Sequence, residues 1–316
     1  MRTRQKKRAS FSPNYAERIN LAIDHIFDRL AGGDSPRLTD VARAAGLSPF
    51  HFHRVFQMMV GSTVADFVRD RRLHRALFLM AYSPRASLTS IALDAGFSSS
   101  SDFSRCFRTR FGLAPSRFDL CAWRAANREQ LESIVQQAAP DWGVPDSFKV
   151  RTLPARRNPD GFKVRIRELA PRSVAYIRVR DPYKDNAVQS AADRLVQWAD
   201  NNTLSQRGWL GYQYENPEIT PLERCCYHVA VEADGFTPKG EVGRFRFPAM
   251  LVAQVEIRGS IELELRALQW LYGVWLPRSG YVPDDHPCFE AWIGKPFAHG
   301  TAHFELFAQL PIKRGI

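Results

Sequence analysis

The 316-residue sequence predicts a multidomain fold: an all-α N-terminal domain with two helix-turn-helix units, then an α+β C-terminal domain of two βαββ repeats. Three observations predict it. Val41–Gly61 and Ile91–Gly112 share one helical pattern. Ser173–Arg180 resembles Leu251–Arg258 at an offset of 78 residues, and prolines punctuate the chain between residues 140 and 161. The length is sufficient for two or three hydrophobic cores.

Positive charge is concentrated in the first part of the chain. Residues 1–125 contain 20 Lys/Arg and 10 Asp/Glu, a net charge of +10, whereas residues 126–316 contain 24 and 23, a net charge of +1. This asymmetry indicates a polyanionic partner for the first part only. Residues 1–12 are expected to form a basic disordered arm that adds weakly to that interaction.

Several classes of protein are disfavoured by composition. The sequence has no run of about 18 apolar residues, so no membrane span is expected, and the N-terminus lacks the apolar segment of a secretory signal. The five cysteines show no C-x-x-C spacing, which argues against a zinc site or a disulfide framework. We therefore expect no cofactor, no metal and a cytoplasmic setting.

The first helix-turn-helix unit is predicted from its turn and its cap. After a helix at Tyr15–Leu30, Gly46 supplies a turn at which a positive φ costs little. Ser48-Pro49 then opens the next helix as N-cap and first helical residue. Three side chains near the start of this helix lie off its apolar face: Phe50, His53 and Arg54.

The second unit repeats the first, with Gly96 matching Gly46 and Arg105 matching Arg54 after a turn that is one residue longer. A helix of this kind suits DNA because the major groove, about 12 Å wide, admits one helix whose first residues reach base edges. The corresponding candidates here are Ser100, Ser101, Asp102 and Arg105, with Arg108 and Arg110 as phosphate contacts.

Arg105 is the strongest candidate for reading a base, since Arg can bind guanine with two hydrogen bonds. The alternative for any single arginine is a solvated surface charge. Asp102 is an acid in a basic site, and two roles stay open: accepting a hydrogen bond from cytosine, or capping the helix and orienting Arg105.

Between the units, Thr63–Ala81 is predicted as a long helix with four arginines on its polar side: Arg69, Arg71, Arg72 and Arg75. Arg124–Ala138 is predicted as a polar helix, and residues 126–161 as the linker between domains at 13–125 and 162–316. From residue 162 the pattern alternates as in strands. Helices are expected at 187–202 and 261–276, each followed by two strands.

Residues 36–120 resemble the DNA-binding domain of the AraC/XylS family of bacterial transcription regulators. The residues that carry the resemblance are Ile91, Ala92, Gly96, Phe97, Phe103, Arg105, Phe107, Gly112 and Pro115. The resemblance implies two helix-turn-helix units, double-stranded promoter DNA as partner, and a location at the nucleoid.

The second half resembles the gyrase-inhibitor-like (GyrI-like) effector-binding domain, a duplicated βαββ unit with a groove between its repeats. In that family a strand glutamate meets cationic or aromatic ligands, and the matching stretch, residues 280–294, places it at Glu290. Trp292 would share the face of Glu290, since strand side chains alternate. Tyr212 and Tyr214, 78 residues earlier, and Tyr281 would complete the groove. The alternatives are a solvent-exposed Glu290 and a core Trp292.

The expected function is a ligand-responsive transcription regulator and not an enzyme. A small apolar or cationic effector would bias either DNA affinity or a contact with RNA polymerase. One alternative is a hydrolase or drug-sequestering protein fused to a DNA-binding domain, with Glu290 as the acidic candidate. Another is a DNA-architectural protein whose second domain makes only protein contacts.

Overall fold

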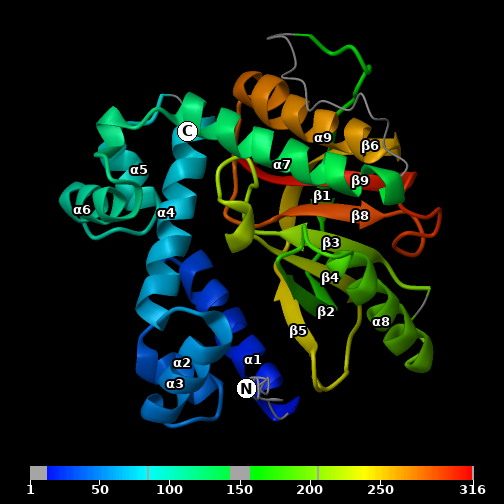
Figure 1. Ribbon diagram of the computed structural model, residues 1–316, viewed down its shortest axis with the longest axis horizontal. Helices are drawn as coiled ribbons and strands as arrows, with labels where there is room; N and C mark the ends of the chain where they lie inside the picture. Colours follow the sequence, from blue (N-terminus) through cyan, green and yellow to red (C-terminus); the bar gives the residue numbers. More distant parts are fainter. Residues whose placement is uncertain (1–12, 84, 143–156, 205, 315–316) are drawn as a thin grey trace, which may run out of the picture.

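The computed structural model describes residues 13–83, 85–142, 157–204 and 206–314, and it has two parts, one helical and one built on a β-sheet (Figure 1). The expected arm at residues 1–12 lies outside the described residues. The helices of the first part are α1 (Pro13–Ala31), α2 (Leu38–Ala44), α3 (Pro49–Val60), α4 (Val64–Tyr82), α5 (Leu88–Asp94), α6 (Ser100–Phe111) and α7 (Leu120–Trp142).

The duplication of the helix-turn-helix unit is confirmed. Each unit consists of a 7-residue helix and a 12-residue helix, α2–α3 and α5–α6. Gly46 and Gly96 form the turns with φ of 63° and 85°, a conformation that glycine adopts without steric cost. Ser48 and Ser99 are the N-caps of α3 and α6, and each side chain accepts a hydrogen bond from the first turn.

The second part is one antiparallel sheet with α8 (Ala187–Asn201) and α9 (Ile261–Trp270). Its strand order is β1-β6-β9-β8-β3-β4-β2-β5, with β7 paired to β9. The strands are β1 (Arg165–Leu169), β2 (Arg172–Arg180), β3 (Trp209–Gln213), β4 (Cys226–Glu232), β5 (Val242–Phe247), β6 (Met250–Gly259), β7 (Tyr281–Pro283), β8 (Cys288–Trp292) and β9 (Phe304–Arg314).

The predicted βαββ repeats are confirmed by this order. The unit β2-α8-β3-β4 and the unit β6-α9-β8-β9 meet where β3 pairs with β8. Because the two halves of the order mirror each other about this pair, the repeats are related by a pseudo-twofold axis. Both α8 and α9 pack on the sheet face that carries Tyr227 and Ala308.

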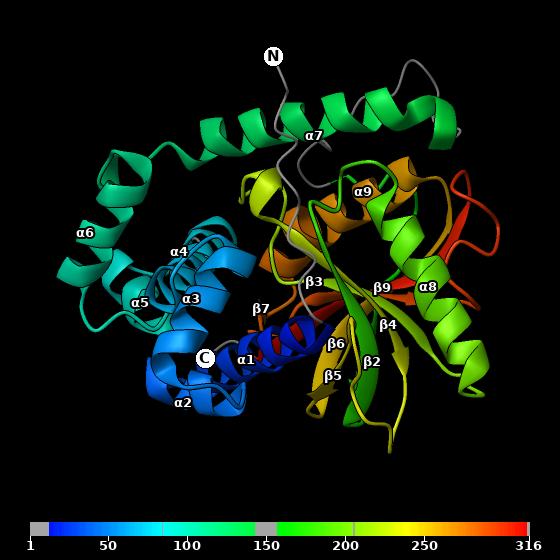
Figure 2. The same cartoon turned by 60° about the horizontal axis from the view of Figure 1, so that its bottom comes forward.

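Helix α1 covers part of the opposite face of the sheet, where it lies against β5 (Figure 2). Tyr176 of β2 donates a hydrogen bond of 2.6 Å to Asp24 of α1, and Arg178 donates one of 2.9 Å to the same carboxylate. Burial raises the pKa of Asp24 to about 6, and Arg178 opposes that rise. The two parts of the chain are thus joined by a buried polar contact.

Helix α7 is longer than the helix predicted at Arg124–Ala138, so the expected linker at 126–161 begins inside a packed helix. Leu131 of α7 is buried against Leu222 of the second part, which explains why this segment is ordered structure. Residues 143–156 of the expected linker lie outside the described residues. No described helix has the length and apolar character needed to cross a membrane.

Candidate DNA interface and ligand cavity

The start of α3 presents its candidates to solvent. Phe50 is 75% exposed, and the Arg54 guanidinium lies 5.9 Å from the centre of its ring. His53 is half-buried. Phe52 and Phe56 of the same helix are completely buried and anchor α3 in the core of the first unit. The structure therefore leaves Phe50 and Arg54 available to a partner on the outer side of the helix.

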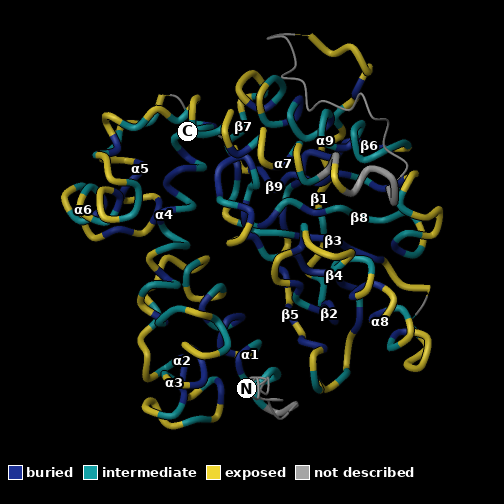
Figure 3. Tube along the Cα trace, viewed as in Figure 1, coloured by how far each residue is buried: buried dark blue, intermediate teal, exposed yellow. Residues whose placement is uncertain are grey.

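The start of α6 carries an exposed group of serines and arginines. Ser100, Ser101, Arg105 and Arg108 line one shallow hollow, and the Arg105 side chain is 78% exposed. In Figure 3 exposed residues mark the outer turns of α6, while buried residues run along α4. The two recognition helices lie on the side of the molecule away from the sheet (Figure 1).

The Asp102 carboxylate forms hydrogen bonds with side chains at the start of its own helix. Its carboxylate accepts a hydrogen bond of 2.8 Å from Arg105 and one of 3.2 Å from Ser98. Burial opposes ionisation, but these hydrogen bonds outweigh it and hold the pKa of Asp102 below its ordinary value. The N-cap is Ser99, so of the roles left open for Asp102 the geometry favours the orientation of Arg105.

The side chain of Arg110 lies against Asp70 of α4, a position that does not favour the predicted phosphate contact. It lies 3.9 Å from Asp70 of α4, and Asp70 also accepts a hydrogen bond of 2.5 Å from Arg224 of the second part. Arg110 follows Arg105 by five residues, which places it on a different side of the helix. It faces α4 and not the hollow that contains Arg105.

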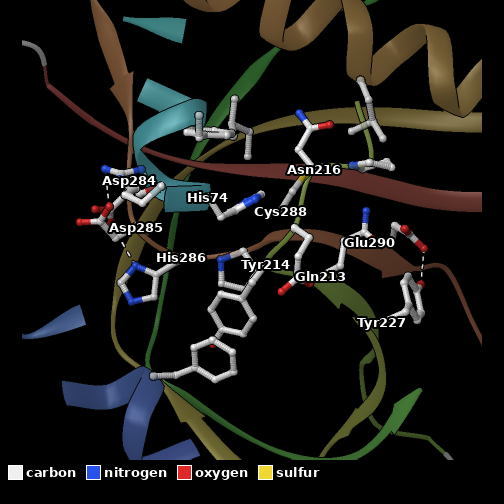
Figure 4. A pocket seen from close by; sticks show the side chains of 18 of the residues that line it. His74, Gln213, Tyr214, Asn216, Tyr227, Asp284, Asp285, His286, Cys288 and Glu290 are labelled. Atoms are coloured by element: carbon white, nitrogen blue, oxygen red, sulfur yellow. Dashed lines mark hydrogen bonds and ion pairs between the residues drawn. The ribbon is translucent and has the colours of Figure 1, made fainter. Parts of the chain in front are cut away.

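A cavity of about 920 Å³ lies between the helical part and the sheet, and Glu290 of β8 lies inside it. Tyr227 of β4 donates a hydrogen bond to Glu290 (Figure 4). Gly211 lies opposite Glu290 in the β3–β8 pair, and a Cβ atom there would lie only 1.7 Å from the Tyr227 hydroxyl. The absence of a side chain at Gly211 is therefore what permits this hydrogen bond.

A second carboxyl group completes the site. Glu264 of α9 is 4% exposed and hydrogen bonds to Glu290. Burial raises the pKa of Glu290 to about 7, although hydrogen bonds from Tyr227 and Glu264 oppose the rise. Burial and the neighbouring Glu290 charge raise the pKa of Glu264 well above its ordinary value. Glu264 is thus the protonated partner of the pair, and its carboxyl group donates a hydrogen bond to Glu290.

The predicted groove residues divide into two groups. Glu290, Trp292 and Tyr214 line the cavity, and their part in ligand binding stays a prediction. Tyr212 does not, and that prediction is wrong: Tyr212 neighbours Gly211, which shares the face of Glu290, so it points to the opposite face. There it stacks on His228 with ring centres 4.5 Å apart.

Tyr281 is also absent from the cavity lining. It stacks on Trp275 with ring centres 6.2 Å apart, on the short strand β7. Two further residues of the cavity, Tyr227 and Glu264, were not predicted from the sequence. A signal for Glu264 existed, because it falls at helical spacing with the buried Ala267 and Leu271, where a carboxyl group is unusual.

The cavity contains a potential negative charge without a counter-ion. Within the described residues neither Glu264 nor Glu290 takes part in an ion pair. The aromatic rings of Trp292 and Phe297, with centres 5.1 Å apart, line the same cavity. A carboxylate beside aromatic faces is chemistry that suits an apolar cation. No group of three or more metal-ligating side chains occurs in the described part of the chain.

Comparison with known proteins assigns both parts to families. Residues 41–119 match the model of a helix-turn-helix domain, and residues 162–313 match that of the GyrI-like small molecule binding domain. Regulatory protein SoxS of Escherichia coli K12 is 35% identical over 86 residues, which are 27% of this chain and 79% of SoxS.

Two further relatives cover different parts of the chain. A DNA gyrase inhibitor of Edwardsiella piscicida is 29% identical over 152 residues, 46% of this chain and 96% of the inhibitor. The HTH-type transcriptional regulator YbfP of Bacillus subtilis is 28% identical over 124 residues, and the match spans only 39% of its length. On these matches the chain belongs to the AraC family of transcription regulators and carries a GyrI-like domain behind its DNA-binding region.

Proposed function

We propose that this protein is a sequence-specific DNA-binding transcription regulator whose GyrI-like domain binds a small apolar cation. The observation that carries the DNA-binding half is the pair of matched helix-turn-helix units, each with an exposed arginine near the start of its second helix. The concentration of positive charge in residues 1–125 supports the same conclusion, because phosphate contacts dominate affinity for DNA. Domains at 13–125 and 162–316 would hold the two functions.

The ligand half of the proposal is supported by the Glu264–Glu290 pair. An apolar cation would replace the missing counter-ion of Glu290 and place its body against Trp292 and Phe297. The volume of the cavity falls in the range of sites for drug-sized molecules, roughly 300–1,000 Å³. Binding would bias DNA affinity, or a contact with RNA polymerase, by favouring one of two conformations.

The test is binding of rhodamine 6G, a fluorescent apolar cation, followed by fluorescence anisotropy with the full chain. Fluorescein serves as an anionic dye of the same ring system. We expect Glu290→Gln to weaken rhodamine 6G binding at least tenfold, since the charge contact is lost, and wild type to bind fluorescein far more weakly. Equal affinity of wild type for both dyes would contradict a cation site.

A hydrolase is the second candidate, and one observation favours it. Burial brings the pKa of Glu290 to about 7, which suits general acid–base catalysis, and the Tyr227 hydroxyl lies beside it. The purified chain would be incubated with p-nitrophenyl acetate and the release of p-nitrophenol followed. Turnover that disappears in Glu290→Gln would support hydrolysis, and an unchanged rate in that variant would exclude it for this ester.

A further inference from the structure

The ligand cavity extends beyond the GyrI-like domain to α4, the helix that connects the two helix-turn-helix units. Residues of α4 at helical spacing line it on one side: Arg71, His74, Arg75, Phe78 and Tyr82. On the other side it is lined by residues of α9 and β8, among them Glu264 and Glu290. In Figure 4 His74 of α4 and Glu290 of β8 appear around the same space.

The α4 wall contributes aromatic surface. Phe78 and Tyr82 lie in edge contact with ring centres 4.9 Å apart, and both contact Tyr272 of the second part, at 5.8 Å and 4.9 Å. The Tyr82 hydroxyl accepts a hydrogen bond of 3.0 Å from Asn216, so this ring has a structural role as well. Phe78 is half-buried and lines the cavity, and the Arg75 guanidinium lies 5.8 Å from the centre of its ring.

Polar contacts hold this wall in place. Arg71 forms an ion pair with Glu215, Arg75 forms one with Asp285, and His74 hydrogen bonds to Thr220. The two arginine charges are therefore compensated. Burial, together with the nearby Arg71 charge, lowers the pKa of His74 to about 3, so its ring is neutral. Arg72 of α4 lines the cavity as well, and its guanidinium donates a hydrogen bond to Ser35. The wall thus combines two ion-paired arginines and a hydrogen-bonded third with aromatic faces.

We propose that the ligand site is bipartite: the Glu264–Glu290 pair of the GyrI-like domain receives the charge of the ligand, and Phe78 of α4 contacts its apolar body. The inference rests on the proposed function, because it assumes that the cavity binds an apolar cation. Ligand affinity would then depend on Phe78, a residue of the DNA-binding region. Phe78 lies on α4, the helix that connects the unit containing α3 to the unit containing α6.

The experiment measures the dissociation constant of rhodamine 6G for four variants of the full chain. Phe78→Ala is expected to weaken binding about tenfold, as for an aromatic anchor removed from a pocket. Phe78→Tyr keeps the ring and should bind within about threefold of wild type. Met80→Ala is the matched control, since Met80 is a half-buried apolar residue of α4 outside the cavity lining, and it should bind as wild type.

The fourth variant, Glu290→Gln, separates this inference from the proposed function. If Glu290→Gln loses affinity while Phe78→Ala binds as wild type, the cation site stands and the bipartite site is overturned. If Glu290→Gln binds as wild type, the proposed cation site itself is overturned. Should Phe78→Ala fail to fold by circular dichroism, Phe78→Leu replaces it with the same expected loss. Equal losses in Phe78→Ala and Met80→Ala would indicate a general effect on α4 and would also overturn the inference.

Discussion

At the scale of the residue, the side chain of Arg105, the proposed base-reading residue, is restrained by its neighbour Asp102. The ion pair with Asp102, one helical turn earlier, restrains a side chain that is otherwise 78% exposed. Such restraint lowers the conformational entropy lost when the guanidinium meets a base. Arg54 lacks an acidic partner of this kind among the described contacts and lies instead over Phe50.

Arg105→Ala should therefore weaken binding to a specific duplex by about 1–3 kcal/mol and hardly change binding to unrelated DNA. The duplex would be obtained by in vitro selection with the full chain, and both affinities measured by anisotropy at one salt concentration. Arg117→Ala removes an exposed arginine outside α6 and serves as control. Equal losses on both DNAs for Arg105→Ala would reduce its role to a phosphate contact.

The pKa of Glu290 predicts how ligand binding depends on pH. Glu264, Tyr227, Tyr183 and Cys288 are the titratable groups around it, and burial raises the pKa of each, that of Cys288 to about 12. Burial therefore favours the neutral form of each of these groups. Glu290 is then the group that titrates near neutrality, with a pKa of about 7.

A cation binds the ionised carboxylate, so binding below pH 7 must first release the proton of Glu290. The affinity for rhodamine 6G should rise as pH increases from 6 to 8, by roughly tenfold, and level off above. Titrations at half-unit steps would measure this, with Glu290→Gln as control, which should be flat. Affinity that falls as pH rises would contradict the assignment of Glu290 as the cation partner.

At the scale of the element, the sequence predicted most helices and strands because each had a local signal. Gly46 and Gly96 marked the turns, Ser48 marked the cap, and alternation marked the strands that form the two repeats. Strand β7 has only three residues, too few for alternation to reveal. The predicted helix at 261–276 is α-helical only to Trp270 and continues as a π-helical turn at Leu271–Trp275.

The errors at this scale came from register and from contacts distant in sequence. A uniform offset of 78 made Tyr212 the counterpart of Glu290 in the first repeat. In the structure Gly211 is the residue that pairs with Glu290, so the offset at this strand is one residue longer. A shift of one residue moves a side chain to the other face of a sheet. Arg71 was predicted on a polar helix face, and its partner Glu215 lies 144 residues away, so no local pattern could identify the pair.

The contact between α1 and the sheet domain predicts a measurable stability effect. Phe27 of α1 stacks on Tyr214 with ring centres 4.1 Å apart and planes at 9°, and the Arg71 guanidinium lies 5.0 Å from the Phe27 ring. Phe27→Ala should lower the free energy of unfolding by about 2–3 kcal/mol, less than for a fully buried ring because Phe27 is half-buried.

Urea unfolding followed by circular dichroism would measure this change. Phe50→Ala removes the same ring from a site that is 75% exposed, and it should change the free energy of unfolding by no more than about 0.5 kcal/mol. Equal effects of the two substitutions would show that the Phe27–Tyr214 contact contributes nothing specific to the stability of the domain arrangement.

At the scale of the whole molecule, the two parts are joined by side-chain contacts as well as by the chain that connects them. Helices α1, α4 and α7 all contact the sheet domain, through Asp24, Arg71 and Arg124 respectively. Arg124 of α7 donates a hydrogen bond of 2.6 Å to Glu218, in the loop that follows β3. The recognition helices remain on the opposite side, so the contacts that join the domains do not cover α3 or α6 (Figure 1).

This arrangement predicts that ligand and DNA affect each other's affinity, because α4 borders the ligand cavity and connects the two DNA-reading units. Coupling between two sites is reciprocal, and coupling free energies of about 1–3 kcal/mol are usual. The extent of coupling depends on how differently the ligand binds the two arrangements of the domains.

The most direct measurement is the affinity of the full chain for its selected DNA duplex with and without saturating rhodamine 6G, at one pH and one salt concentration. We predict that the dye changes the dissociation constant by at least about fivefold in wild type and leaves it unchanged in Glu290→Gln. A dissociation constant for DNA that is the same with and without dye in wild type, while the dye is bound, would contradict ligand control of DNA binding.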